Sequence, residues 1–216
     1  MCRLSGNSPP IGIIDYGAGN LRSIANALRV CGAATRFVSK PCGLEAVSGV
    51  VLPGVGSFGY AVASLAANGL DAALVEWAGA RPLLGICLGL QLMFPASAES
   101  PGQKGLGILD GTVVRLIQSR ARKVPNMGWD PVVVERTCLL GEPGDRPYCY
   151  FAHSYVCVPA EDIVEAWAGH GATRFAASVR KGLVQGVQFH PEKGGPAGLA
   201  FLRRFVAVCG EVPCRW

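Results

Sequence analysis

The chain has 216 residues, of which 50% are hydrophobic and 16% are charged, a composition that suits one globular domain with a sizeable core and excludes extended disorder. The formal net charge of +5 comes from scattered basic residues without interleaved aromatic side chains, which argues against binding to nucleic acid. No apolar run of about 18 residues occurs, so the sequence predicts no membrane span.

Strands and helices alternate in the first half of the chain. Short apolar runs predict strands, and an apolar residue every three or four positions predicts helices between them. The strands are predicted at 11–15, 34–38, 50–52 and 82–86, and the helices at 21–31, 60–68, 71–78 and 88–94. This alternation predicts an α/β fold with a central, mostly parallel sheet flanked by helices.

The second half has a different pattern, with short alternating strands separated by turns. These strands are predicted at 107–116, 132–134, 148–158 and 164–168, followed by a hairpin of 174–180 with 183–189 and a closing helix at 196–208. The pattern predicts an additional antiparallel layer. Because no repeat or linker interrupts the chain, we expect one domain over 11–210, preceded by an N-terminal extension at 1–10.

The segment Gly85-Ile86-Cys87-Leu88-Gly89 lies between a buried strand and a helix. Small residues two positions before and after a nucleophile are typical of the sharp, strained turn called a nucleophile elbow. In such a turn Cys87 is the nucleophile, and the backbone N–H of Leu88 helps to hold an oxyanion. The alternative is a buried cysteine flanked by packing glycines.

The segment His190-Pro191-Glu192 supplies what a cysteine nucleophile needs. A thiol attacks well only when a base takes its proton, and histidine is the usual base. On an extended chain, residues two apart project to the same face, so Glu192 is expected to orient one ring nitrogen of His190 while the other nitrogen faces the sulfur. The three residues Cys87, His190 and Glu192 therefore predict a cysteine hydrolase.

Two further segments are candidates for the same pocket. Pro53-Gly54-Val55-Gly56 follows a strand expected to neighbour the nucleophile strand, and its glycines let backbone N–H groups approach a substrate; an ordinary turn fits equally well. Gln91 lies one helical turn after Cys87 and can face the pocket, although an exposed helix glutamine has the same spacing. His153, within an aromatic strand, fits either the core or the pocket lining.

No metal or cofactor site is predicted. The three histidines lie in different contexts without paired ligand spacing, and His170, between two glycines, looks like a turn residue. Gly17-x-Gly19 lacks the third glycine of a dinucleotide-binding loop, and no phosphate-binding GxxxxGK[ST] segment occurs.

The nine cysteines do not suggest disulfides. Their number is odd, and they form no CxxC pairs. Cys31, Cys149, Cys157 and Cys209 fall inside apolar runs, where cysteine behaves as a small buried hydrophobe. Residues 1–10 contain no apolar signal region. We therefore expect a reducing, cytoplasmic location.

Taken in order, these motifs resemble those of the class I (triad-type) glutamine amidotransferases, and more narrowly those of the glutaminase subunits of imidazole glycerol phosphate synthase. The segments that carry the resemblance are Ile14–Leu21, Leu52–Phe58, Gly85–Gln91, Lys104–Gly107, Val124–Trp129, Tyr150–Tyr155 and Gly186–Lys193. The elbow and His-Pro-Glu mark the wide family, whereas the Asp-Tyr-Gly start, the Pro-Gly-Val-Gly loop and the Met-Gly-Trp segment point to the narrower one.

The resemblance implies a reaction and a partner. Cys87 would attack the side-chain amide of L-glutamine, His190 would move the proton, and water would release L-glutamate from a glutamyl thioester. The ammonia would pass to a cyclase subunit, a (β/α)₈ barrel, which forms imidazole glycerol phosphate and an aminoimidazole carboxamide ribonucleotide in L-histidine biosynthesis. A sealed path would keep the ammonia from being protonated in water.

The resemblance also implies roles for residues outside the triad. It places glutamine-binding groups at Gly54, Gln91, Ser154 and Tyr155, oxyanion-hole groups at Leu88, Val55 and Gly56, and the cyclase interface at Asn20, Met127, Trp129, Tyr150 and Lys193. The chain departs from the family pattern at four positions, since members often carry histidine at Asn126, asparagine at Asp130, serine at Gly194 and an aromatic residue at Cys149.

Two other functions remain as alternatives. A glutaminase could serve another partner, such as a pyridoxal phosphate, formylglycinamidine or anthranilate synthase, although the segment Val124–Trp129 argues against these. A binding module could retain the fold without turnover. We also expect the isolated chain to hydrolyse glutamine slowly, because the mobile backbone of the Pro-Gly-Val-Gly loop would misalign an oxyanion donor until a partner orders it.

Overall fold

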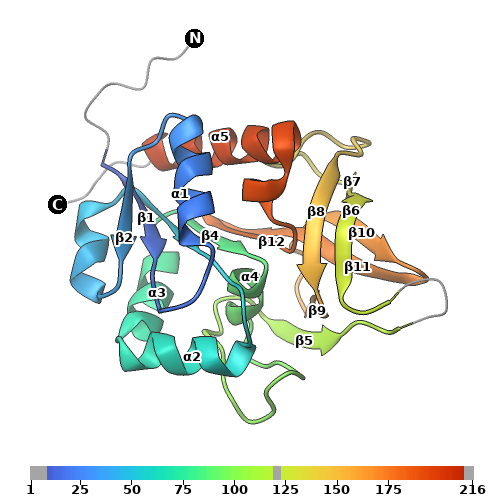
Figure 1. The fold of residues 1–216 in the computed structure, drawn as a ribbon, viewed down its shortest axis with the longest axis horizontal. Coiled ribbons are helices and arrows are strands. Elements are labelled where there is room, and N and C mark those ends of the chain that lie inside the picture. Colours follow the sequence, from blue (N-terminus) through green and yellow to red (C-terminus); the bar gives the residue numbers. More distant parts are fainter. Residues whose placement is uncertain (1–8, 119–122, 212–216) are drawn as a thin grey trace.

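The computed structural model describes residues 9–118 and 123–211, and the predicted extension at 1–10 lies outside the described residues except for Pro9 and Pro10. Its central feature is an eight-stranded mixed sheet (Figure 1). The strands follow the spatial order β2 (Thr35–Val38), β1 (Ile11–Ile14), β3 (Gly49–Leu52), β4 (Leu83–Ile86), β12 (Val184–Val187), β11 (Thr173–Lys181), β10 (Val164–His170) and β7 (Val133–Val134).

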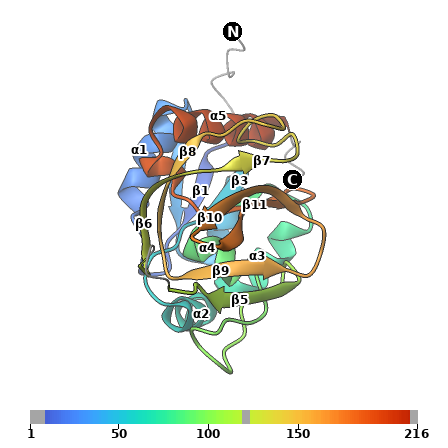
Figure 2. The same ribbon diagram turned by 90° about the vertical axis from the view of Figure 1, so that its right-hand side faces the viewer.

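The first five strands in this order are parallel, and the last three continue the same sheet in antiparallel pairing. Two separate two-stranded sheets pair β5 (Gly111–Arg115) with β9 (Tyr155–Pro159) and β6 (Asn126–Pro131) with β8 (Tyr148–His153) (Figure 2). The α/β prediction with a mostly parallel core is confirmed. Much of the antiparallel part extends the central sheet rather than forming a layer of its own.

Helices cover both faces of the sheet. On one face α1 (Leu21–Val30) packs with α5 (Gly195–Glu211), and on the other lie α2 (Phe58–Ala67), α3 (Leu70–Ala78) and α4 (Leu88–Leu92) (Figure 1). Consecutive strand residues alternate between two apolar clusters: Ile13 packs with α1 and α5, whereas Ile14 packs with the helices of the opposite face. The strands β1, β3 and β4 are buried on both faces, which explains their continuous apolar runs.

One strand was not predicted, because its pattern is inverted. In β6 the buried residues are Asn126 and Asp130, whereas Met127 and Trp129 are exposed. An alternation with polar residues inside and apolar residues outside, interrupted by Gly128, does not match the usual half-buried strand. Two short 3₁₀ helices, η1 (Pro41–Ala46) and η2 (Pro191–Lys193), also went unpredicted.

Three local expectations need correction. The predicted strand at 148–158 divides at Ser154 into β8 and β9, which belong to different sheets. His170 is not a turn residue, because it ends β10 and is 2% exposed. Glu192 lies in η2 rather than on extended chain, although the preceding His190 is extended.

The seven described cysteines are free thiols. Of the four expected in apolar surroundings, Cys149, Cys157 and Cys209 are buried and Cys31 is partly exposed. Among the described residues no single helix has the length and apolar character needed to cross a membrane, and one pair, α2 with α3, bent by 94°, meets the criterion by length and composition only.

Candidate active site

Cys87 lies at the turn between β4 and α4, in strained backbone. Its φ of 54° and ψ of −109° make it the only non-glycine residue with a positive φ in the described part of the chain. Such a conformation is unfavourable for a residue with a side chain and persists only where its surroundings enforce it. Here the Cys87 N–H donates to the carbonyl of Val187, at 2.8 Å, and the side chain is 6% exposed.

Two glycines let the turn approach the loop that follows β3. A Cβ atom on Gly89 would lie 1.9 Å from the carbonyl oxygen of Leu52, and a Cβ atom on Gly54 would lie 2.2 Å from the backbone nitrogen of Gly89. Any side chain at either position would therefore collide with backbone. The Pro53–Gly56 loop lies directly against the Cys87 turn for this reason.

The pairing of β12 with β4 brings the histidine motif to the cysteine. These strands are parallel, with Val187 opposite Ile86, so both chains leave the sheet at the same edge. The backbone N–H of His190 donates to the carbonyl of Tyr150 at 2.8 Å, which anchors the motif to β8. The His190 ring nitrogen Nδ1 lies 2.9 Å from Oε1 of Glu192, and both side chains are almost fully buried.

Opposing effects act on the pKa of His190. Burial disfavours the imidazolium and would lower the pKa, but hydrogen bonds to Cys87 and Glu192 and the negative charges on these two groups favour it. The net effect raises the pKa of His190 above its usual value. The surroundings of the ring therefore stabilise its protonated form beside the sulfur, which is the state in which a thiol has transferred its proton.

A cavity of about 250 Å³ opens at Cys87, near the small end of the roughly 300–1,000 Å³ usual for small-molecule sites. It collects the residues that were assigned to glutamine binding and to the oxyanion hole, namely Gly54, Val55, Gly56, Leu88, Gln91, Ser154 and Tyr155. Glu192 does not line this cavity; it lies behind His190. Gln91 is buried, not exposed, and its Nε2 donates to the carbonyl of Tyr155 at 3.0 Å.

Four lining residues were not assigned to the site from sequence: Glu99, Pro125, Ala152 and His153. The sequence left open whether His153 belongs to the core or to the pocket lining. Both descriptions apply, because the ring is buried and also lines the cavity. Burial lowers the pKa of His153 to about 4, so the ring is neutral at pH 7. Glu99 lies in a loop, where no periodic pattern marks it; its Oε2 accepts a hydrogen bond from the N–H of Phe58 at 2.8 Å.

Aromatic residues adjoin His190 on its outer side. The rings of Trp129 and Tyr150 meet edge-to-face at 5.9 Å, and Lys193 Nζ lies 5.3 Å from the centre of the Tyr150 ring. Tyr150 in turn lies 6.5 Å from His190. Trp129 is 50% and Met127 67% exposed, and Asn20, before α1, is also exposed. Four of the five residues assigned to an interface thus belong to β6, β8 and η2.

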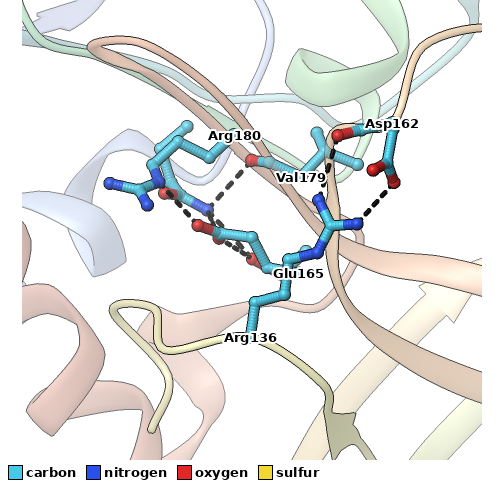
Figure 3. Close-up of polar contacts among 7 residues, drawn as sticks. Arg136, Asp162, Glu165, Val179 and Arg180 are labelled. Carbon is cyan, nitrogen blue, oxygen red and sulfur yellow. Dashed lines mark hydrogen bonds and ion pairs between the residues drawn. The ribbon is translucent and has the colours of Figure 1, made fainter. Parts of the chain in front are cut away.

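A second group of polar side chains, three of them buried, lies on β10, β11 and β12. We call Glu165, Ser178, Arg180 and Gln185 the Glu165 cluster. The Glu165 carboxylate accepts hydrogen bonds from Arg180 Nε at 2.7 Å, Ser178 Oγ at 3.1 Å and Gln185 Nε2 at 3.0 Å. Figure 3 shows Glu165 and Arg180 facing each other, with the Arg136–Asp162 ion pair beside them. None of the four cluster residues lines the Cys87 cavity. No group of three or more potential ligands among the described residues is placed to hold a metal ion.

Comparisons with known proteins show the family to which the chain belongs. The family model described as glutamine amidotransferase class-I matches residues 12–209. A protein from Methanothermobacter thermautotrophicus, named imidazole glycerol phosphate synthase subunit HisH, is 45% identical over 92% of this chain and 98% of its own. A longer Arabidopsis thaliana protein, named imidazole glycerol phosphate synthase hisHF, chloroplastic, is 42% identical over 90% of this chain and 33% of its own.

A solved structure has the same fold. The crystal structure of a glutamine amidotransferase superimposes with a TM-score of 0.73 and covers 93% of this chain and 98% of that one. Its sequence identity is 24%, so this likeness concerns the fold alone.

Proposed function

Because the chain belongs to the class-I glutamine amidotransferases, and within them to the HisH subunits of imidazole glycerol phosphate synthase, we propose that it hydrolyses L-glutamine through the triad of Cys87, His190 and Glu192. The observation that carries the proposal is the pairing of a strained cysteine at a cavity with a histidine held by a buried carboxylate. A merely structural cysteine needs neither feature.

The proposed reaction proceeds in two halves. His190 takes the thiol proton of Cys87 before the attack, and the resulting thiolate attacks the side-chain carbonyl carbon of glutamine. The developing oxyanion is held by backbone N–H groups of Leu88 and of the Val55–Gly56 loop. His190 then gives the proton to the leaving nitrogen, and ammonia departs from a glutamyl thioester. In the second half His190 removes a proton from water, which attacks the thioester; glutamate leaves and the thiol is restored. Glu192 keeps the ring oriented throughout.

The remaining lining residues would bind the substrate. Gly54 brings backbone close to the cavity, and Gln91, Ser154 and Tyr155 offer polar groups for the amino acid end of glutamine. Gln91 and the Tyr155 carbonyl already hold each other, so their positions are fixed before a substrate arrives. Preorganised polar groups of this kind give orientation at a small entropic cost.

We further propose that the exposed cluster of Met127, Trp129, Tyr150 and Lys193, with Asn20, docks a cyclase subunit with a (β/α)₈ barrel that receives the ammonia. An exposed tryptophan and methionine beside the catalytic histidine are typical of a protein interface. The Arabidopsis relative, of which this chain covers 33%, has room for a second enzyme in one polypeptide. Passage between subunits would keep ammonia unprotonated, and the cyclase would use it in histidine biosynthesis.

Glutamate release should be measured with the purified chain, alone and mixed with a histidine-pathway cyclase and its nucleotide ligand. We expect slow release alone and a clear rise in the mixture; no rise would reject the choice of partner. Cys87→Ala should abolish release, whereas Cys42→Ala, which removes an exposed thiol, should leave it unchanged. Release that survives Cys87→Ala would remove the triad from the mechanism.

A further inference from the structure

We propose that Gln188 is a positioning residue for the nucleophile, whose carboxamide donates a hydrogen bond to the sulfur of Cys87 and holds it toward the cavity. Gln188 Nε2 lies 3.6 Å from Cys87 Sγ, a normal separation for a hydrogen bond to sulfur. The inference rests on the proposed role of Cys87 as nucleophile, but it concerns a residue outside the triad and outside the lining of the cavity.

The backbone around Gln188 is fixed on two sides. Its N–H donates to the carbonyl of Ala177 at 3.0 Å, and the carbonyl of the preceding Val187 accepts from the N–H of Cys87 at 2.8 Å. The side chain is completely buried. A buried amide is costly unless its polar atoms are satisfied, and an apolar side chain of similar size would fill the same space without that cost. The hydrogen bond that Gln188 donates to the Cys87 sulfur therefore explains why an amide is buried at this position.

Gln91 fixes the orientation of the Gln188 amide. Gln91 Nε2 donates to Gln188 Oε1 at 3.3 Å and to the carbonyl of Tyr155 at 3.0 Å. With its oxygen engaged by Gln91, the Gln188 amide must turn its nitrogen toward Cys87. The N–H of a neutral amide favours negative charge on the atom it bonds to, so this contact is a second polar contact to the sulfur besides that of His190.

The chain of contacts continues to the strand that carries the exposed tryptophan. The Tyr155 carbonyl also lies 3.0 Å from His153 Nδ1; a carbonyl only accepts, so Nδ1 carries the hydrogen. His153 Nε2 then accepts from Asn126 Nδ2 at 3.3 Å, which agrees with a neutral ring. Asn126 begins β6, next to Met127. A continuous series of contacts therefore joins β6 to the sulfur, through Asn126, His153, the Tyr155 carbonyl, Gln91 and Gln188.

The test is the alkylation rate of Cys87 by iodoacetamide as a function of pH, read on the Cys87 peptide by mass spectrometry. Gln188→Met keeps the size of the side chain and removes the donor. We expect about tenfold slower alkylation at pH 7, since a hydrogen bond to a charged group is worth about this factor. Glutamate release with saturating partner should show a lower kcat with little change in KM, because Gln188 does not line the cavity.

Gln185→Met is the matched control. Gln185 is a buried glutamine three residues earlier, in β12, bonded to Glu165 instead of Cys87, so its loss should leave the Cys87 profile unchanged. Cys42, which is exposed, serves as an internal reference for alkylation in every variant. Three groups that interact with Cys87, namely His190, Tyr16 and Cys157, are the same in all variants.

Two further variants test the same inference if Gln188→Met does not fold. Gln91→Met frees the Gln188 amide and should shift the profile in the same direction by a smaller amount, and Asn126→Leu should shift it least. An unchanged profile in folded Gln188→Met, or equal shifts in Gln188→Met and Gln185→Met, would overturn the inference. Failure of the wild-type protein to release glutamate would refute the proposed function instead, since alkylation does not depend on glutamine.

Discussion

Two polar clusters have different consequences: the Glu165 cluster, and the Cys87 cluster of Cys87, Gln188, His190 and Glu192. They come closest around β12, which contains Gln185 and ends just before Gln188. Gln185 in β12 bonds to Glu165, whereas Gln188, three residues later, bonds to Cys87. Both clusters hold a carboxylate within a few per cent of full burial, at Glu165 and at Glu192. Burial of charge is therefore not what distinguishes a candidate active site from a structural cluster in this fold.

Three features separate the clusters. The Glu165 carboxylate is saturated by three donors, and it bridges strands that are already paired. The Cys87 cluster instead contains strained backbone, adjoins a cavity, and raises the pKa of a histidine. Strain and a shifted pKa are costs that a purely structural cluster has no reason to retain. The contrast predicts that the first cluster governs stability and the second governs chemistry.

The largest effect is expected from Glu192→Gln. Without the carboxylate, the Nδ1 atom of His190 accepts from the new amide and the ring carries its hydrogen on the nitrogen that must act as the base. We expect kcat for glutamate release to fall by about 10³- to 10⁴-fold. The free energy of unfolding should also fall, by about 2 kcal/mol, because the variant removes one of the two groups that stabilise protonated His190. A stability loss with activity retained would reverse the comparison.

The next effect concerns the pH dependence of stability. The pKa of His190 in the folded state is raised above its unfolded value of about 6.5. Protonation of His190 therefore contributes its full stabilisation at pH values below about 6.5. This contribution is lost as pH rises through the folded-state pKa. The difference in unfolding free energy between wild type and His190→Asn should thus shrink by roughly 3 kcal/mol from pH 6 to pH 10. Chemical denaturation across that window measures it.

The corresponding experiment on the other cluster should give a flat profile. The stability difference between wild type and Glu165→Gln should vary little over that window, because the Glu165 cluster contains no histidine. A slope comparable to that of His190→Asn would mean that the pH dependence does not originate at the candidate active site.

Glu165→Gln itself is expected to lower the free energy of unfolding by about 2 kcal/mol. The variant loses one charge-assisted bond to Arg180 and turns an amide nitrogen toward other donors. The effect is moderated because the Arg180 side chain is 56% exposed, where water can replace the lost partner. Glutamate release per folded molecule should equal that of wild type. A folded but inactive Glu165→Gln would show that the two clusters act together.

How far the sequence predicted this arrangement depends on the range of the interactions. The parallel half of the sheet was predictable because β3 and β4 are buried on both faces and therefore read as continuous apolar runs. The order of strands in which β12 lies beside β4 was not, since a pairing between strands about a hundred residues apart leaves no local pattern. The inverted strand β6 was missed because its polar residues face inward.

The candidate site divides in the same way. Cys87, His190 and Glu192 stand in compact motifs with a direct chemical interpretation. The structure places Cys87 and His190 at one cavity, with Glu192 behind His190. Gln188 stands inside the same histidine segment, yet its role follows only from the register that sets Val187 opposite Ile86. The three partners of Glu165 are 13, 15 and 20 residues away in sequence, so a lone glutamate in an apolar strand gave no sign of a cluster.

The smallest effect is expected from Ser178→Ala. The Ser178 hydroxyl donates to Glu165 and accepts from Gln185 Nε2 at 2.9 Å, so its removal should lower the free energy of unfolding by about 1 kcal/mol. Ser178 also pairs with Val187, the residue before Gln188, and so lies where the clusters come closest along the strands. Because the backbone pairing remains, the Cys87 alkylation profile should not change. A shifted profile would mean that loosening the Glu165 cluster moves the nucleophile, and the separation between a stabilising and a catalytic cluster would no longer hold.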